Sequence, residues 1–383
     1  MDVTGKLRAT AGRLQEWLQR WLIHDACPLW STHGFDRVHG GFHERLDGTA
    51  PLDEPRRARV QPRQMSALSN AAVLGWKGDA AGLVSRGLDY FLTYYRRPDG
   101  LYRTRVAPDG RPIDNRALLY DQAFALLGLA ESQFVLDRRR ALVEEARLLR
   151  VAIYRLLKHR VVGFESVLGN GNPLSANAHM HLLEAGLAWR ALSDDPVWVT
   201  LCDEIGNLAL THFIDAKSGV VREHFMPDWS VMPGLEGRRI EPGHHFEWAW
   251  LLFRWGGTDH HEAWSAGLRL LDIGERHGVR DGFVMNGLFD DCTVADASSR
   301  LWPQAERLRV AAFAARATGE EWYWRMANGA AESLCLYLQG SVAGSWYDRR
   351  TPEGRFIEEP APASTFYHIV GAIKELTAAV SSP

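Results

Sequence analysis

Six glycines recur along this chain of 383 residues at nearly equal intervals, each in the same kind of local sequence. Around each lies an aromatic or apolar, strand-like stretch, followed by a loop and then by an apolar helix that a polar residue opens. The six are Gly41, Gly100, Gly163, Gly219, Gly282 and Gly344. A fixed period indicates one repeated supersecondary unit, because a single unit cannot bury its own apolar face.

The polar residues that open the helices follow the same period. They are Arg63, Asp121, His181, His244, Glu306 and His368. If six units close into a ring, equivalent positions of all units meet around one axis. The repeat would then bring three histidines, an arginine and two carboxylic acids together, which predicts an active site.

Two kinds of helix alternate between these markers. One kind is charged and amphipathic and belongs on an outer surface; the other is rich in small apolar residues and should be buried on most faces. The charged helices are expected at 7–22, 80–96, 138–158, 196–213, 260–276 and 320–338, and the apolar ones at 65–74, 123–129, 182–191, 246–252, 308–317 and 369–380. Six such pairs predict an all-α fold, an (α/α)6 barrel, with residues 1–383 as a single domain.

The glycine segments fall between an outer helix and the next inner one. GFHERL, GLYRTRV, GVVREHF and GSWYDRR alternate as strands do, and Asp109-Gly110 and Glu353-Gly354 stand where hairpin turns are expected. We therefore expect short β-hairpins in the loops of one rim. The inner helices begin at that rim, so their free N–H groups point at whatever binds there.

Composition excludes several classes of protein. Lys and Arg total 44 against 47 Asp and Glu, with both signs interspersed, which argues against a nucleic-acid partner. No stretch approaches the ~18 uninterrupted apolar residues of a membrane span, and no leader pattern is visible. Four isolated cysteines favour a reduced, cytoplasmic protein; they are Cys27, Cys202, Cys292 and Cys335. A homo-oligomer is left open.

The segment Pro242-Gly243-His244-His245-Phe246-Glu247-Trp248 carries the sharpest chemical signal. His244 and Glu247 are three residues apart, so both lie on one face of a helix that starts at or near His244. Glu247 is therefore expected to orient the His244 imidazole by a hydrogen bond. His245 points elsewhere and is expected to be structural.

The other helix starts supply further candidates. His368 is the counterpart of His244, and Asn177 shares a helix face with His181, while His179 is expected to be structural. Arg63 is a candidate donor to a developing oxyanion. The remaining candidates for sugar binding are Tyr120, Asp121, Trp302 and Gln304.

These side chains suit proton transfer. Histidine has an unperturbed pKa of ~6.5, so it takes and gives protons near neutral pH. Removing a proton next to a carbonyl needs a base, an acid and a positive group, and His244, His368 and Arg63 supply them without a metal. No carboxylate cluster suited to Mg²⁺ or Mn²⁺ and no nucleotide-binding loop is visible, so no cofactor is expected.

At these residues the chain resembles the N-acylglucosamine 2-epimerase superfamily of sugar epimerases and isomerases, over nearly its whole length. The resemblance implies an (α/α)6 barrel in which histidines at the positions of His244 and His368 exchange protons at sugar C1 and C2. It also implies that His181 and Arg63 bind and polarise the sugar. The segments that carry it are 242–248, Asn177 with 180–185, Trp302-Pro303-Gln304-Ala305-Glu306 and Phe366-Tyr367-His368.

Within the superfamily, the stretch 362–368 looks most like the aldose–ketose isomerases that act on mannose. The expected function is interconversion of D-mannose and D-fructose through a cis-enediol, with a monosaccharide as the partner. One alternative is a 2-epimerase of the N-acylglucosamine or cellobiose type. Another is a sulfoquinovose isomerase, in which Arg238 or Arg239 would bind the sulfonate. A less favoured one is a glycosidase using Asp121 and Glu306 as its carboxyl pair.

Overall fold

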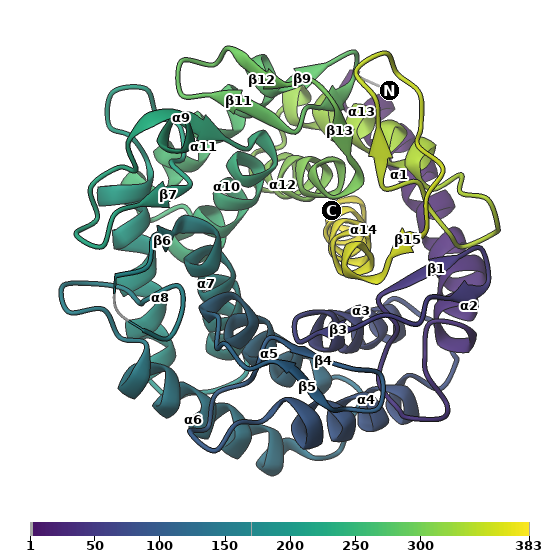
Figure 1. Ribbon diagram of the computed structural model, residues 1–383. Helices are drawn as coiled ribbons and strands as arrows, with labels where there is room; N and C mark the ends of the chain where they lie inside the picture. Colours follow the sequence, from purple (N-terminus) through teal and green to yellow (C-terminus); the bar gives the residue numbers. More distant parts are fainter. Residues whose placement is uncertain (1–2, 170, 383) are drawn as a thin grey trace.

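The computed structural model describes residues 3–169 and 171–382, and its helices form two concentric rings (Figure 1). Within these residues the inner ring consists of α3 (Val60–Val73), α5 (Leu119–Ser132), α7 (Ala176–Arg190), α10 (Pro242–Gly256), α12 (Leu301–Thr318) and α14 (Phe366–Ser381). The outer ring consists of α1 (Val3–Trp21), α4 (Ala80–Tyr95), α6 (Arg139–Leu156), α8 (Val197–Leu208), α11 (His261–Gly278) and α13 (Glu321–Tyr337). The predicted (α/α)6 barrel is confirmed.

The two rings follow from the two kinds of helix in the sequence. On α6 the buried residues include Leu142, Leu149 and Ile153, which form one stripe, while the charged residues face outward. On α5 nearly every residue from Leu119 to Ala130 is buried, because inner helices pack against neighbours on both sides and against the outer ring. Small residues allow this: an added Cβ on Gly128 would lie 2.5 Å from Pro62 of the neighbouring inner helix.

Each inner helix begins several residues earlier than its apolar run predicted. The polar residues expected at the helix starts therefore lie within the first two turns, as His244 does in the helix that begins at Pro242. The expectation failed because the first turn of a helix at this rim carries polar side chains that line a site, and apolar periodicity begins only beyond it.

Short strands cover the end of the barrel where the inner helices begin (Figure 1). As predicted, hairpins turn at Asp109-Gly110 and around Gly354, and β1 pairs with β15 to join the first and last repeats. The strands are β1 (Arg45–Asp47), β2 (Ala50–Pro51), β3 (Arg56–Arg57), β4 (Arg105–Val106), β5 (Pro112–Asp114), β6 (Leu174–Ser175), β7 (His224–Phe225), β8 (Arg239–Ile240), β9 (Val279–Arg280), β10 (Phe283–Val284), β11 (Gly287–Phe289), β12 (Val294–Asp296), β13 (Ser299–Arg300), β14 (Arg349–Arg350) and β15 (Ala361–Pro362). Short helices fill the connections at α2 (Cys27–Thr32), α9 (Gly234–Arg238), Leu22–Ala26, Ala209–Phe213 and Ala363–Thr365.

The six repeated glycines share one backbone conformation. All have positive φ, from 72° at Gly163 to 91° at Gly100, a region that residues with a Cβ rarely adopt. Space is equally restrictive at Gly344, where an added Cβ would lie 2.3 Å from the backbone oxygen of Asp25. The period in the sequence therefore marks a turn that returns the chain from the outer helix to the rim.

A side chain of the following inner helix fixes the strand after this turn. The Gln61 carboxamide accepts from the Phe42 N–H at 2.7 Å and donates to the Phe42 carbonyl at 2.9 Å. Gln122 does the same for Tyr102, and Gln304 for Val284.

Histidines take this place in two other repeats. The Nε2 of His179 accepts from the Phe164 N–H at 2.9 Å, and that of His245 accepts from the Val221 N–H at 3.2 Å. The structural roles predicted for both histidines are confirmed. In the sixth repeat, the Phe366 and Trp346 rings stack with centroids 5.7 Å apart.

None of the helices in the described residues is both long enough and apolar enough to cross a membrane. The four cysteines are all free.

We expect Gln61→Leu to lower the free energy of unfolding by about 2–4 kcal/mol, because it leaves the buried N–H and carbonyl of Phe42 without their partner. Urea denaturation followed by circular dichroism measures the change. Gln133→Leu is the matched control, since the amide nitrogen of Gln133 has no hydrogen-bond partner among the described residues. Equal stability of the two variants would contradict the bracing role.

Candidate active site

A pocket of about 310 Å³ opens at the hairpin rim, over the first turns of the inner helices. It is lined by Arg57, Arg63, Tyr120, Asn177, His181, Glu241, His244, Glu247, Arg300, Trp302, Asp348, Pro362, Ser364, Thr365 and His368. The structure thus brings together eight of the residues that the sequence singled out. These are Arg63, Tyr120, Asn177, His181, His244, Glu247, Trp302 and His368.

Two predicted sugar-binding residues lie outside this pocket. Asp121 is fully buried and accepts hydrogen bonds from Thr104 and, at 3.0 Å, from Arg59. Gln304 is also fully buried, and its carboxamide is used up by the backbone of Val284 and by the carbonyl of Arg300. The prediction was wrong for both, because a polar residue in the first turns of a helix can point toward the rim backbone instead of the barrel axis.

The predicted hydrogen bond between Glu247 and His244 is a further correction. The Nδ1 of His244 instead lies 2.9 Å from the Glu223 carboxylate, which comes from the strand-like segment after Gly219. Glu247 lines the pocket next to His181, with its Oε1 at 3.7 Å from the His181 Nδ1. The spacing placed Glu247 and His244 on one helical face, but a residue from the hairpin reaches the ring first.

All three pocket histidines are held in the same way. The Nδ1 atoms of His181, His244 and His368 lie 3.2, 2.9 and 2.6 Å from the carboxylates of Glu184, Glu223 and Glu306 respectively. A carboxylate only accepts hydrogen bonds, so each ring presents its Nδ1–H to the glutamate. The Nε2 atoms are left for the pocket, which each histidine lines.

The three imidazoles nevertheless differ in charge. Burial by itself disfavours the charged ring of His244, but the Glu223 carboxylate and then Glu241 outweigh it and raise the pKa to about 10. Burial dominates at His368, whose pKa is lowered in spite of Glu306. Burial also lowers the pKa of His181, to about 4. At neutral pH the pocket therefore contains one imidazolium and two neutral imidazoles.

Trp302 lies beside two of the pocket histidines, His244 and His368. Its ring centroid is 5.2 Å from that of His244 and 5.6 Å from that of His368. The charged and the neutral imidazole thus flank one aromatic face, and an indole face is the usual platform for the apolar side of a sugar ring. A single bound sugar next to Trp302 would lie within reach of both rings.

Arg63 supplies a fixed positive charge on the other side of the pocket. Its guanidinium donates to the Tyr120 hydroxyl at 2.6 Å and to the Ser364 carbonyl at 3.2 Å. It also lies over the Phe124 ring, 4.0 Å from the centroid. A guanidinium held on three sides is preorganised to stabilise a negative oxygen.

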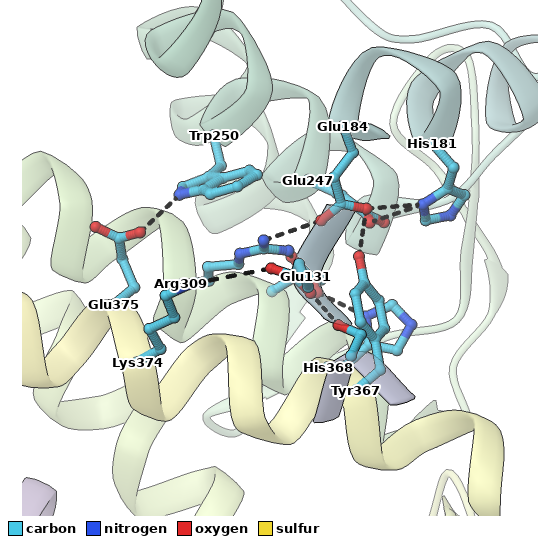
Figure 2. Close-up of polar contacts among 12 residues, drawn as sticks. Glu131, His181, Glu184, Glu247, Trp250, Arg309, Tyr367, His368, Lys374 and Glu375 are labelled. Carbon is cyan, nitrogen blue, oxygen red and sulfur yellow. Dashed lines mark hydrogen bonds and ion pairs between the residues drawn. The ribbon is translucent and has the colours of Figure 1, made fainter. Parts of the chain in front are cut away.

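A buried charge cluster forms the floor beneath the histidines (Figure 2). Arg309 donates to Glu184 at 2.9 Å and to Glu306 at 3.4 Å, so one guanidinium supports the carboxylates that hold His181 and His368. Burial disfavours the charged forms of both acids, yet Arg309 and the histidines keep their pKa values below the ordinary range. Tyr367 adds a short hydrogen bond from its hydroxyl to Glu184.

Glu247 is the uncompensated member of this floor. Burial, followed by the neighbouring charges of Glu306 and Glu184, raises its pKa well above the ordinary value, so the group is held as a neutral acid. Its Oε1 has no hydrogen-bond partner among the described residues. A neutral carboxyl that lines the pocket can donate a hydrogen bond to a sugar hydroxyl.

Among the residues that the structure describes, two groups of side chains have a spacing that would suit a metal ion: His181 with Glu184 and Glu247, and Glu247 with Glu306 and His368. Ligand atoms within each group lie within 4.8 Å of one another. The sequence shows no carboxylate cluster, and the structure corrects this expectation, because the glutamates come from three different repeats. Arg309 already neutralises two of them, so a metal-free site stays a prediction.

Sequence reasoning missed Glu223, although the chain carries a signal for it. Glu223 stands four residues after its repeat glycine, as Thr104 and Asp348 do. Each of the three contacts a residue at the start of an inner helix: Glu223 contacts His244, Thr104 contacts Asp121, and Asp348 accepts from Thr365 at 2.8 Å. Counting from the glycine would have placed Glu223 at the rim.

Comparison with known protein families gives a match over most of the chain. The N-acylglucosamine 2-epimerase (GlcNAc 2-epimerase) family matches residues 40–372. The chain belongs to this family.

Individual relatives refine this result. A mannose-6-phosphate isomerase of Rhizobium meliloti (strain 1021) is 45% identical over 370 residues, covering 94% of this chain and 95% of that protein. A D-mannose isomerase of Thermobifida fusca is 26% identical over 338 residues, covering 80% and 81%. The structure of cellobiose 2-epimerase from Spirochaeta thermophila DSM 6192 covers 98% of both chains with a TM-score of 0.86 at 22% identity, which shows a shared fold. This family member is therefore a sugar isomerase or epimerase, and its relatives confirm the resemblance to the isomerase branch.

We expect Glu223→Gln to lower the pKa of His244 from about 10 by roughly 1–3 units, because the charge of the hydrogen-bonded carboxylate is lost. The imidazolium then loses its proton at lower pH. NMR titration of labelled histidine side chains measures this midpoint. Glu241→Gln is the control: it removes a more distant charge without a bond to the ring, so its effect should be smaller. An unmoved midpoint in Glu223→Gln would refute the pairing.

Replacing Arg309 by methionine should destabilise the fold by about 3–5 kcal/mol, because it leaves buried carboxylates without their counter-ion. Thermal and urea unfolding measure the loss. Arg325→Met removes an exposed ion pair with Glu321 and should cost less than about 1 kcal/mol. Similar values for the two variants would show that the floor does not depend on Arg309.

Proposed function

We propose that this protein is an aldose–ketose isomerase that interconverts D-mannose and D-fructose through a cis-enediol. One observation carries the proposal: His244 and His368 flank Trp302 in one pocket, and at neutral pH His244 is charged whereas His368 is neutral. Isomerisation needs an acid and a base on the same sugar, and these two rings are poised as that pair. The isomerase names of two relatives support the same reaction class.

In the proposed mechanism His244 acts as the acid. Its Nε2–H protonates the ring oxygen O5 as the pyranose opens, and the imidazole recovers a proton from the O1 hydroxyl, which becomes the carbonyl. In the enediol step it gives this proton to O1 and recovers one from O2, so that it ends in its charged form. Glu223 keeps the ring charged by accepting from Nδ1 at 2.9 Å. Because the pKa is about 10, this acid is present across the physiological range and is lost only as the pH rises through that value.

His368 acts as the carbon base. Its neutral ring offers the Nε2 lone pair, takes the proton from C2 of mannose and returns it to C1, which gives fructose. Glu306, at 2.6 Å from Nδ1, stabilises the imidazolium that forms in between. Because the pKa of His368 is lowered, its ring stays neutral at pH values below the ordinary histidine pKa of ~6.5. Activity is expected to fall as the pH drops through this lowered pKa, because the base then becomes protonated.

The other pocket residues bind and polarise the sugar. Arg63 stabilises the enediolate oxygen, and the Tyr120 hydroxyl is fixed by Arg63 at 2.6 Å. Trp302 packs against the sugar ring. Asn177, His181 and the neutral Glu247 bind hydroxyl groups, and no cofactor takes part.

A phosphorylated mannose is the second candidate substrate, because the relative at 45% identity is named a mannose-6-phosphate isomerase. Arg57 and Arg300, two arginines that line the pocket, would donate hydrogen bonds to the phosphate group. Both are already paired, with Glu44 and Glu241 respectively, which favours the neutral sugar.

A 2-epimerase would use the same residues and return the proton to the opposite face of C2.

The geometry gives no support to a sulfoquinovose isomerase or to a glycosidase. Arg238 is bound to Asp290 and Asp291, and neither Arg238 nor Arg239 lines the pocket, so the expected sulfonate contact is not formed. The carboxyl pair suggested for a glycosidase, Asp121 and Glu306, is fully buried and also lies outside the pocket lining.

Incubation with mannose in D₂O tests the proposal. We expect fructose to form, with deuterium at C1 of fructose and at C2 of recovered mannose, because His368 exchanges its proton with solvent. Both NMR signals are measured for wild type, His244→Ala and His368→Ala, and each variant should lose about 10²–10⁴-fold in rate. Glucose as the main product would instead indicate an epimerase. Reaction of mannose 6-phosphate alone would replace the substrate assignment.

Exhaustive dialysis against a chelator tests the absence of a metal. We expect the isomerisation rate to stay within about twofold, because Arg309 and the histidine Nδ1–H groups already occupy the carboxylates that a cation would need. Metal content is measured in parallel. Loss of activity that added Mn²⁺ or Zn²⁺ restores would instead assign a metal to the group around Glu247.

A further inference from the structure

A second cavity, of about 350 Å³, lies on the other side of the catalytic floor, between the later turns of the inner helices. Figure 2 shows Arg309 and Glu184 between Trp250 and Glu375 on one side and His181 on the other. The mechanism proposed above leaves this cavity unused. Its volume is within the ~300–1,000 Å³ that ligand sites occupy.

The walls of this cavity are mainly apolar. They include Leu127, Leu187, Ala188, Trp250 and Val370, from four different inner helices. The indole of Trp250 is fixed, because its Nε1–H donates to Glu375 at 3.1 Å and Arg309 lies 3.5 Å from the ring centroid. A preformed cavity with a rigid aromatic wall favours a ligand with an apolar or aromatic body.

The acidic side chains of the cavity are already engaged. Glu184 accepts from Arg309 and Tyr367, and Glu375 is 3.0 Å from Arg316 besides its bond to Trp250. Glu131 accepts from Ser66 and lies 3.9 Å from the Lys374 ammonium group. Each of these acids therefore already has a basic side chain close to its carboxylate.

Arg254 is the exception among the charged side chains that line the cavity. Its side chain reaches solvent, its contact is with the Trp250 ring at 5.2 Å, and no carboxylate pairs with it among the described residues. Burial of its guanidinium lowers the pKa of that group; the Glu375 carboxylate opposes this, and repulsion from the nearby cations Arg309, Arg316 and Arg190 lowers the pKa further. An anion at this position would relieve that repulsion.

The C-terminal end of α10 does not reverse the preference of this cavity for an anion. Carbonyl groups at the C-terminus of a helix favour a cation. At α10, however, the Arg190 side chain already donates to the carbonyls of Arg254 at 2.9 Å and Trp255 at 3.3 Å. These two carbonyls are therefore not free to bind a cationic ligand.

We propose that this cavity binds a small organic carboxylate, whose apolar body packs against Trp250 and whose carboxylate pairs with Arg254. The site is separate from the catalytic pocket and does not depend on the reaction proposed above. Its floor residues Glu184 and Arg309 are also the supports of His181 and His368, so a ligand here would contact the groups that position the catalytic rings.

Phenylacetate is a suitable probe, because a flat ring and a carboxylate are separated by one methylene. Saturation-transfer NMR and calorimetry with the full chain measure its binding, in comparison with 2-phenylethanol and 2-phenylethylamine. We expect phenylacetate to bind at millimolar or lower concentration and both uncharged and cationic analogues to bind more weakly. Absence of phenylacetate binding, or stronger binding of the amine, overturns the proposal.

Two variants locate the probe. Arg254→Gln should weaken phenylacetate by about tenfold or more, since a charge-assisted hydrogen bond is lost. Arg276→Gln, on the outer helix α11 and 69% exposed in its side chain, is the matched control and should leave binding unchanged. Unchanged binding in Arg254→Gln overturns the proposal.

Trp302→Ala distinguishes the two cavities, because Trp302 lines the catalytic pocket and not the second cavity. We expect phenylacetate to bind this variant as it binds wild type. Weakening equal to that in Arg254→Gln would place the probe among the catalytic residues and overturn the proposal.

Discussion

The compensation of buried charge by Arg309 is the interaction on which the site depends. Three glutamates from three repeats meet beneath the pocket, and only a cation or a proton can keep so many carboxyl groups out of water. Arg309 pairs with Glu184 and Glu306, while Glu247 keeps its proton. These two solutions produce different chemistry, since the charged acids hold histidines and the neutral acid is left to face the pocket.

The repeated frame explains how one fold gathers such different groups. In every repeat a left-handed glycine turns the chain back to the rim. In five of them a glutamine or histidine then bonds the strand that follows, as Gln61 does for Phe42. Because this bracing uses fixed positions, the neighbouring positions are free to carry His181, His244 or His368. The frame is repeated, whereas the chemistry is not.

The sequence predicted the barrel, its hairpin rim and eight of the pocket residues, because periodicity reports which positions share an axis. The prediction failed where a side chain in the first turns of an inner helix can point either into the pocket or toward the rim. Asp121 and Gln304 lie in the first turn of their helices, as expected, but neither points into the pocket. Asp121 is bonded to Arg59, and Gln304 is bonded to the rim backbone at Val284. Glu247 has the right spacing from His244, yet Glu223 holds that ring. Spacing along one helix cannot reveal a competitor from another segment.

The order of residues by itself determined the six-unit architecture, the left-handed turns and the identity of the groups around the axis, since each follows from local conformation or from the period. Only the tertiary structure decided the protonation of those groups. His244 and His368 are equivalent in the repeat, but one faces Glu223 and Glu241 and the other is governed by its burial. A proton responds to the distance of every nearby charge, and those distances exist only after the ring has closed.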